Sequence, residues 1–142
     1  MLKLVIPVDG SEASLRAIDT VARLFLAGGV AATLLHVREG KATYHGDISP
    51  RDYERIADHE RDKQTRILEE ALQHAKAQGI TQVQCEAEAG TPEVDIPSAA
   101  ERLGADMIVM ATRGLGAVSA LLMGSVAQKV VHAANVPVLL VK

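Results

Sequence analysis

Short apolar runs alternate with longer amphipathic segments along the whole chain. Apolar runs of this length, bounded by turn residues, predict β-strands, and here they cover residues 2–8, 31–37, 82–89, 106–112 and 136–142. Between the runs, apolar residues recur at helical spacing, as at Leu15, Ile18 and Ala22. The pattern therefore predicts five strands joined by four helices. We expect those helices to stop in left-handed residues at Gly28, Gly79, Gly104 and Asn135.

Regular alternation of strand and helix predicts a parallel sheet with right-handed crossovers and helices on both faces. Four of the five runs are almost continuously apolar, as expected for strands covered on both sides. The run at 82–89 differs, because Val83, Cys85, Ala87 and Ala89 alternate with glutamines and glutamates. One wet face indicates an edge position, so we predict an open five-stranded sheet of order 3-2-1-4-5. Cys85, on the inward phase of that strand, is expected to pack in the core.

The second helix is predicted to be the longest, over residues 50–78. Its segment 58–66, DHERDKQTR, has no apolar residue and is expected to stand in solvent. The charges there are spaced for local ion pairs of Asp58 with Arg61, Glu60 with Lys63 and Asp62 with Arg66. The preceding connection, residues 38–50, is polar and contains glycine, so we expect a mobile loop able to act as a flap over a site.

Composition narrows the functional class. At 142 residues the chain suits a single domain, residues 1–142. Its one cysteine excludes an intramolecular disulfide and favours a reducing, cytoplasmic location. The net charge of −3 and the scarcity of aromatic residues argue against nucleic-acid binding. No apolar run approaches the length of a membrane span, and the N-terminal run is short and leads directly into a turn, unlike a signal peptide.

Open parallel sheets bind ligands beyond the carboxyl ends of their strands, where the strand order reverses. In the predicted order, that point lies between the first and fourth strands and brings PVDGSE (7–12) and ATRGLG (111–116) face to face. The first loop carries Asp9 and Glu12, which repel phosphate, and one glycine where a dinucleotide-binding loop needs three. Dinucleotide and flavin-phosphate binding are therefore disfavoured.

The second loop and the segment after it have the character of an anion site. Arg113 and Gly114 lie in the loop, and Ser125 followed by Gln128 predicts a capping box that opens the last helix. Free N–H groups and the positive helix end at 124–126 could hold a phosphate without the lysine of a P-loop. The alternative remains that Ser125 is only a helix cap and Gly114 only a turn glycine.

The histidines and the remaining polar residues predict no catalytic centre. His36, at the end of an apolar strand, is interpreted as a satisfied core histidine, and His45, His59, His74 and His132 lack the spacing of metal ligands. The chain has no nucleophile elbow and no convincing acid–base pair. We predict no catalytic residues and no metal site formed by protein side chains alone.

These features together resemble the universal stress protein family over the full length of the chain. The resemblance rests on PVDGSE, LLHV, AGTPEVDIPSAAERLGADMIVMATRG and GSVAQKVVHAANVPVLLVK, which follow the family's order. ATP-binding members carry G-x2-G-x9-G-[ST] after the fourth strand. Gly114, Gly124 and Ser125 match the last three fixed positions, whereas Ala111 replaces the first glycine.

The resemblance implies an adenine nucleotide alpha-hydrolase-like fold with ATP and Mg²⁺ as cofactors. By position, the first loop would lie by the ribose and adenine, the fourth strand would line the base pocket, and the last helix would surround the phosphates. Mg²⁺ would be held through the phosphates, near Asp9. The ATP-binding residues carried over are Pro7, Val8, Asp9, Val37, Met110, Ala111, Arg113, Gly114, Gly124, Ser125, Val126 and Ala127.

The family's dimerisation also has a basis in the sequence. The last run is apolar on both faces and would form the other edge of the sheet, which is an aggregation hazard unless it is covered. Pairing with a second copy across a two-fold axis removes that edge. We expect a homodimer through the last strand, formed by Val136, Pro137, Val138, Leu139, Leu140 and Val141.

Three functions follow as hypotheses. The first is a cytosolic homodimeric ATP-binding switch in the stress response, with little or no hydrolysis and with protein partners that are unknown. The second is a stress-induced interaction module that does not bind nucleotide, which Ala111 favours. The third, an ATP-cleaving enzyme of the related hydrolase group, is weakened because no SGGxDS-type loop follows the first strand.

Overall fold

The computed structural model describes residues 1–40, 48–114 and 123–142, and strands and helices alternate through them. The helices are separated by strands in the order that the apolar pattern predicts. The elements are β1 (Leu2–Pro7), α1 (Glu12–Phe25), a 3₁₀ turn (Leu26–Gly28), β2 (Val30–Glu39), α2 (Pro50–Ala77), β3 (Gln82–Gly90), α3 (Pro92–Arg102), β4 (Met107–Ala111), α4 (Ser125–Ala133) and β5 (Val138–Val141).

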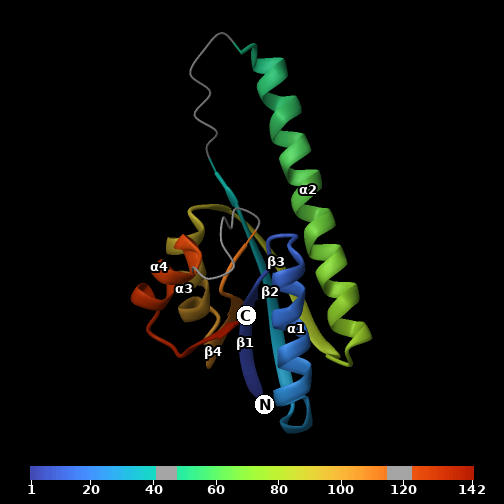
Figure 1. The fold of residues 1–142 in the computed structure, drawn as a ribbon. Helices are drawn as coiled ribbons and strands as arrows, with labels where there is room; N and C mark the ends of the chain where they lie inside the picture. Colours follow the sequence, from blue (N-terminus) through green and yellow to red (C-terminus); the bar gives the residue numbers. More distant parts are fainter. Residues whose placement is uncertain (41–47, 115–122) are drawn as a thin grey trace.

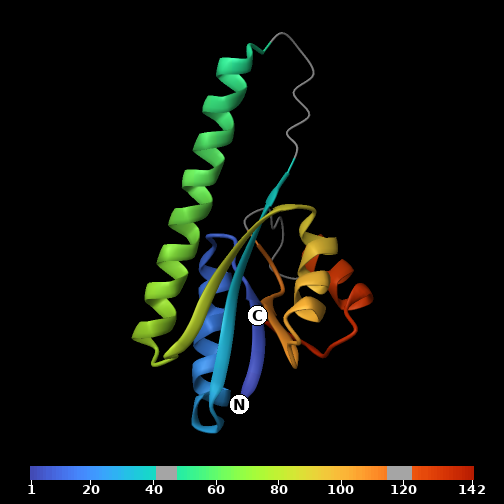
Figure 2. The same ribbon diagram turned by 180° about the vertical axis from the view of Figure 1, so that it is seen from behind.

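The strands form one parallel sheet of order β3-β2-β1-β4-β5, which confirms the predicted fold class and strand order. Helices α1 and α2 cover one face, and α3 and α4 cover the other (Figures 1 and 2). Strand β1 lies at the centre, with Leu2 to Pro7 in register with Val30 to Leu35 of β2. The carboxyl ends of β1, β2 and β4 consequently meet at one end of the sheet, where the chain order reverses.

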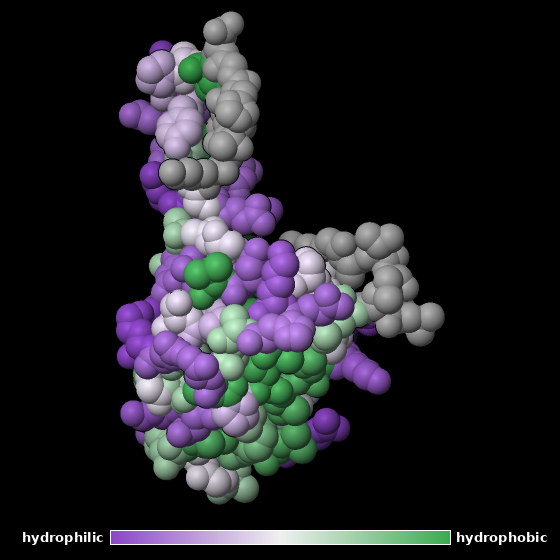
Figure 3. All heavy atoms as spheres, turned by 90° about the vertical axis from the view of Figure 1, so that its left-hand side faces the viewer, coloured by the Kyte–Doolittle hydropathy of each residue, from purple (hydrophilic) through white to green (hydrophobic). Residues whose placement is uncertain are grey.

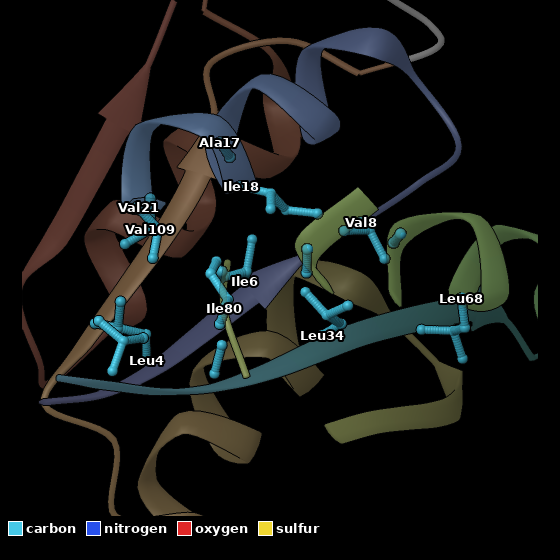
Figure 4. Close-up of a cluster of buried hydrophobic side chains, with 14 residues drawn as sticks. Leu4, Ile6, Val8, Ala17, Ile18, Val21, Leu34, Leu68, Ile80 and Val109 are labelled. Atoms are coloured by element: carbon cyan, nitrogen blue, oxygen red, sulfur yellow. The ribbon is translucent and has the colours of Figure 1, made fainter. Parts of the chain in front are cut away.

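Two hydrophobic cores lie on opposite faces of this sheet because alternate strand residues point to opposite sides. Leu4, Ile6 and Leu34 pack against α1 and α2, and Figure 4 shows Ile18, Val21 and Leu68 directed into the same cluster. Val5, Leu35 and Ile108 pack against α3 and α4. The strand ends are thus held from both sides, which fixes the positions of the loops that follow them.

Helix α2 extends well beyond the sheet. Its 28 residues span about 42 Å, and its N-terminal half protrudes past the ends of most strands (Figures 1 and 2). The segment 58–66 is exposed as predicted except for Gln64, which is buried. Of the three predicted ion pairs in the described part of α2, Asp58–Arg61 forms at 2.7 Å and the other two do not.

Several element boundaries differ from the predicted ones. Helix α1 runs into the 3₁₀ turn, so the positive φ falls at Gly29 instead of Gly28, whereas Gly79 and Gly104 have positive φ as predicted. Asn135 does not, because the residue after α4, Ala134, is already extended. Strand β5 begins after Pro137, which has no N–H to pair. Strand β2 continues to Glu39 because its ladder with β3 continues to that residue.

Strand β3 occupies the edge, but the prediction that Cys85 packs in the core is wrong. Its side chain is exposed, with Sγ 3.8 Å from the carbonyl oxygen of Leu68 in α2. An edge strand has a neighbour on one side only, and α2 covers this one incompletely. Partial burial raises the pKa of the Cys85 thiol. Within the described residues, no helix combines the length and apolar character that crossing a membrane requires.

Candidate functional site

A cleft of about 760 Å³ opens at the carboxyl ends of β1, β2 and β4. A volume of this order is typical of small-molecule sites. The cleft is lined by every residue that the family resemblance implied for ATP binding: Pro7, Val8, Asp9, Val37, Met110, Ala111, Arg113, Gly114, Gly124, Ser125, Val126 and Ala127. These residues come from four segments of the chain and meet where the strand order reverses.

The turn after β1 holds Asp9 in a fixed position. Oδ1 of Asp9 accepts hydrogen bonds from the backbone N–H of Ser11, at 2.9 Å, and from the Ser11 hydroxyl. Ser11 also caps α1, since its Oγ accepts from the N–H of Ser14. Gly10 has a φ of 86°, which a residue with a side chain adopts only with strain. The sequence PVDGSE therefore forms a tight turn that directs a carboxylate into the cleft.

The two loops predicted to face each other do so through Asp9 and Gly114. A Cβ placed on Gly114 would lie 2.3 Å from Oδ2 of Asp9, so the carboxylate rests against the glycine backbone. Gly114 has no positive φ. Its importance here is the space it leaves for Asp9. In the described residues, then, the acidic loop after β1 and the loop between β4 and α4, which we call the glycine loop, form one surface.

Gly124 anchors the start of α4 to the end of β4. Its N–H donates to the carbonyl oxygen of Thr112 at 2.6 Å, and the N–H of Thr112 donates to Val141 of β5 at 2.9 Å. A Cβ on Gly124 would lie 3.2 Å from the Thr112 oxygen, which is a tight contact. The glycine thus permits close approach of two backbone segments, and it fixes where α4 begins.

The predicted capping box at the start of α4 is wrong. Gly124 is the N-cap and Ser125 the first helical residue, and no side chain caps the helix. The N–H groups of the first turn have no partners within the helix, and the positive end of the helix dipole lies here. Ser125, Val126 and Ala127 line the cleft, so these donors sit at its wall beside half-buried Arg113. Such an arrangement suits an anion.

Ala111, the departure from the family motif, is the last residue of β4. It is 9% exposed and pairs with Val141 of β5. No residue other than glycine has a positive φ in the described chain, so Ala111 adopts its conformation without strain. The only consequence of replacing glycine here is the methyl group that the alanine adds to the cleft wall.

One wall of the cleft was not predicted from the sequence. It is a stripe of α2 whose positions recur every three or four residues, as one helix face requires. We call this stripe the α2 wall, and it comprises Tyr53, Ile56, Ala57, Glu60, Lys63, Gln64 and Ile67. The apolar members at this spacing were the available signal. Further lining residues that the sequence did not indicate include Thr112 from the glycine loop and Pro92 and Ile96 from α3.

Gln64 ties the α2 wall to the sheet. Its Nε2 donates to the carbonyl oxygen of His36 at 3.0 Å and to that of Glu88 at 2.9 Å. Both acceptors lie near the ends of their strands, β2 and β3. A single buried amide therefore fixes the position of α2 relative to the cleft, which explains why this polar residue is buried in an otherwise solvated segment.

His36 is not the satisfied core histidine that the sequence suggested. It lines the cleft and is only half-buried, yet its Nδ1 is buried without a hydrogen-bond partner among the described residues. Loss of hydration lowers the pKa of His36 below the usual 6.5. Asp9 and Glu60 act in the opposite direction, and Lys63 reinforces the lowering. The imidazole is consequently held mostly neutral near pH 7.

The described residues contain no cluster of three His, Cys, Asp or Glu side chains suited to hold a metal ion. The predicted flap, residues 38–50, falls largely on residues 41–47, outside the described chain. Residues 115–122 of the glycine loop also lie outside it.

Comparison with known proteins identifies the family. The family model for the universal stress protein family matches residues 1–142. The chain belongs to this family. Universal stress protein MJ0531 of Methanocaldococcus jannaschii is 33% identical over 99% of this chain and 81% of its own length. A universal stress protein of Thermus aquaticus is 32% identical over 98% of this chain and 97% of that protein.

Solved universal stress proteins share the fold. One in complex with cAMP is 26% identical, with a TM-score of 0.73, over 99% of this chain and 95% of that one. A family protein of Arabidopsis thaliana with AMP bound has a TM-score of 0.72 at 21% identity, over 100% of this chain and 92% of that one. The second likeness bears on the fold alone. Both of those proteins hold an adenine nucleotide.

Proposed function

We propose that the cleft binds an adenine nucleotide, with ATP and Mg²⁺ as the physiological ligand. The observation that carries this proposal is the meeting, in one cleft, of the Asp9 turn, the glycine loop and the uncapped N-terminus of α4. The cAMP-bound relative supports the same class of ligand.

In this proposal, different residues of the cleft contact the phosphates and the adenine. Phosphates lie against the first-turn N–H groups of α4 and the guanidinium of Arg113. Met110, Ala111 and Val37 form an aliphatic slot for adenine, in keeping with the scarcity of aromatic residues in the chain. Micromolar affinity corresponds to about −8 kcal/mol. A few hydrogen bonds to charged oxygens, at about 1.5–3 kcal/mol each, bring this value within reach after the entropy of binding.

Mg²⁺ fits this site only together with the phosphates. It commonly binds through one or two carboxylates plus phosphate oxygens and retains several waters. Asp9 lies against Gly114 at the glycine loop and supplies one such carboxylate. When bound, the ion would neutralise phosphate charge beside that carboxylate, which offsets the repulsion between Asp9 and the nucleotide.

The protein is further proposed to act as a homodimeric switch in which nucleotide occupancy changes the affinity for protein partners. Strand β5 is a short apolar edge, half-exposed along its length, and Figure 3 shows a broad hydrophobic area on the body of the molecule, viewed from the side of α4. Pairing of β5 with a second copy removes the free strand edge. A single cysteine fits a reducing compartment, and the cytoplasm is the proposed location.

Ala111 favours a second candidate, an interaction module that binds no nucleotide. Its methyl group narrows the slot at the position where ATP-binding members carry glycine. The absence of backbone strain at Ala111 supports the nucleotide-binding proposal instead. This cleft differs at that position from one with glycine only by the volume of one methyl group.

Calorimetric titration of the purified, nucleotide-free protein with ATP and Mg²⁺ tests the proposal. Saturable binding at micromolar concentrations is expected. The matched variant Gly124→Val, which crowds the backbone of Thr112 and the phosphate-facing donors, is expected to abolish it. A folded wild-type protein that binds nothing at millimolar ATP would favour the interaction module. Unchanged affinity in Gly124→Val would show that the phosphates lie elsewhere.

A further inference from the structure

The imidazole of His36, at the cleft, has an unsatisfied buried nitrogen in the described part of the chain. Its Nδ1 is buried and has no hydrogen-bond partner among the described residues. A buried polar atom left in this state destabilises the folded protein. Groups of this kind call for an explanation, which is often a functional one. None of the residues predicted from the family motif accounts for it.

The position of the missing partner indicates where the ring proton lies. Buried N–H groups without an acceptor are rarer in proteins than acceptors without a donor. A neutral ring with its proton on Nδ1 would bury such an N–H. The other tautomer leaves only a lone pair at Nδ1 and places the N–H at Nε2. His36 lines the cleft, and of its two ring nitrogens only Nδ1 is both buried and without a partner among the described residues, which leaves Nε2 for a ligand.

We infer that Nε2 of His36 carries the ring proton and donates it to the nucleoside part of the bound nucleotide, an inference that rests on the function proposed above. His36 thereby becomes a specificity-determining residue on the side of the cleft formed by the α2 wall. The acceptor is a sugar oxygen or a ring nitrogen of the nucleoside, since these are the acceptors that a nucleoside carries.

The nucleoside, rather than the phosphates, is indicated by the arrangement of charge. Asp9 and Glu60 both act electrostatically on His36 and give its surroundings a negative potential that Lys63 offsets only in part. An additional phosphate would be repelled there. The cationic and N–H donors for phosphate, Arg113 and the start of α4, belong to a different wall. His36 faces α2 with Gln64 bonded to its own carbonyl oxygen, whereas α4 covers the opposite face of the sheet.

Two variants and two ligands separate nucleoside contact from phosphate contact. His36→Phe keeps a ring of similar size but removes the N–H. Its affinities for adenosine and for ATP with Mg²⁺ are both expected to fall by the same factor, about five- to tenfold. The matched control Arg113→Ala should weaken ATP by about ten- to a hundredfold and leave adenosine unchanged. NMR titration reaches the weaker adenosine affinities.

A spectroscopic measurement distinguishes a ligand contact from a structural role. Long-range ¹H–¹⁵N correlation of the imidazole reports the tautomer directly. At pH 7.5 we expect His36 with its proton on Nε2, and adenosine should shift the Nε2 resonance. A ring proton on Nδ1 would overturn the inference. So would a His36→Phe variant that binds ATP and adenosine as tightly as wild type binds each of them. If wild type binds no nucleotide at all, the proposed function fails as well. If wild type binds nucleotide and His36→Phe binds it equally well, the role of His36 is rejected and the proposed function stands.

Discussion

At the scale of single residues, the glycines of the cleft are needed for different physical reasons. Gly10 has a positive φ that closes the turn after β1. Gly114 instead leaves space, because Oδ2 of Asp9 occupies the position that its Cβ would take. The sequence motif marks Gly114 without showing why it matters, since Asp9 comes from a loop about a hundred residues away. The family resemblance indicated a glycine at position 114, and the structure supplies the physical reason for it.

Gly114→Ala is expected to displace the Asp9 carboxylate, because a Cβ would lie 2.3 Å from Oδ2. ATP affinity should fall at least tenfold, while the free energy of unfolding changes by less than about 1 kcal/mol since the displaced atom ends a side chain. Calorimetry and urea unfolding measure the two quantities. Gly28→Ala is the control, because nothing lies within 4 Å of its Cβ position and its φ is not positive. Equal ATP affinity in the two variants would contradict the role of Gly114.

His36 makes the stability of the folded protein depend on pH. Burial lowers its pKa in the folded state below the usual 6.5, against the opposing charges of Asp9 and Glu60 and with that of Lys63. Between the folded-state pKa and the unfolded-state pKa, the unfolded chain binds more protons than the folded protein. The free energy of unfolding therefore decreases as pH falls below about 6.5.

The comparison with His36→Phe isolates this contribution from the other histidines. Between pH 7.5 and pH 5, wild type should lose more free energy of unfolding than the variant, as measured by urea unfolding at each pH. Parallel pH profiles for the two proteins would show that His36 titrates alike in both states. The sequence placed His36 correctly in the second strand but could not show an unpartnered Nδ1, which depends on how α2 packs.

At the scale of secondary-structure elements, α2 combines a solvated surface with a wall of the cleft. The polar sequence of segment 58–66 correctly predicted solvent exposure for all of its residues except Gln64. The side-chain amide of Gln64 is buried and donates to carbonyl oxygens of β2 and β3. Helical periodicity of apolar residues could have indicated the α2 wall. The burial of Gln64 could not be predicted, because a buried glutamine is distinguished only by carbonyl groups that the fold brings near it. For the same reason the exposure of Cys85 was missed, since alternation does not reveal how completely a helix covers an edge strand.

Gln64→Leu is expected to destabilise the protein by about 2–3 kcal/mol, since it leaves two carbonyl acceptors without their donor. Because α2 then loses its attachment near His36, nucleotide affinity should also fall. Chemical unfolding and calorimetry test both effects. Gln73→Leu provides the control on the same helix, as Gln73 is exposed. A destabilisation no larger than that of the control would mean that Gln64 does not hold α2 to the sheet.

At the scale of the whole molecule, the strand order follows from two simple properties of the sequence. Alternation of strand and helix imposes a parallel sheet, and the polar face of β3 places that strand at an edge. The order then determines that the Asp9 turn and the glycine loop meet. The predicted strand order was correct because it depends on patterns that extend over many residues. Misjudging the position of one residue does not change such a pattern. The same order leaves β5 at the opposite edge.

The free edge of β5 predicts the effect of a single proline. Pro137 and Val141 turn their carbonyl oxygens toward β4, so the alternating backbone directs the N–H of Leu140 away from the sheet. Leu140→Pro removes that donor while leaving the ladder to β4 intact, as is tolerated on an edge strand. If β5 pairs with a second copy, wild type should be a dimer and the variant a monomer in analytical ultracentrifugation.

Leu140→Val keeps the N–H and most of the apolar surface, and it should remain dimeric. The N–H of Thr112 donates to Val141, and Thr112 in turn accepts from Gly124, so the edge strand and the start of α4 share one hydrogen-bonded connection. A dimer that persists in Leu140→Pro would place the interface on another surface. Retention of ATP binding by the monomeric variant would show that each copy holds a complete cleft, as the residues lining it in a single chain imply.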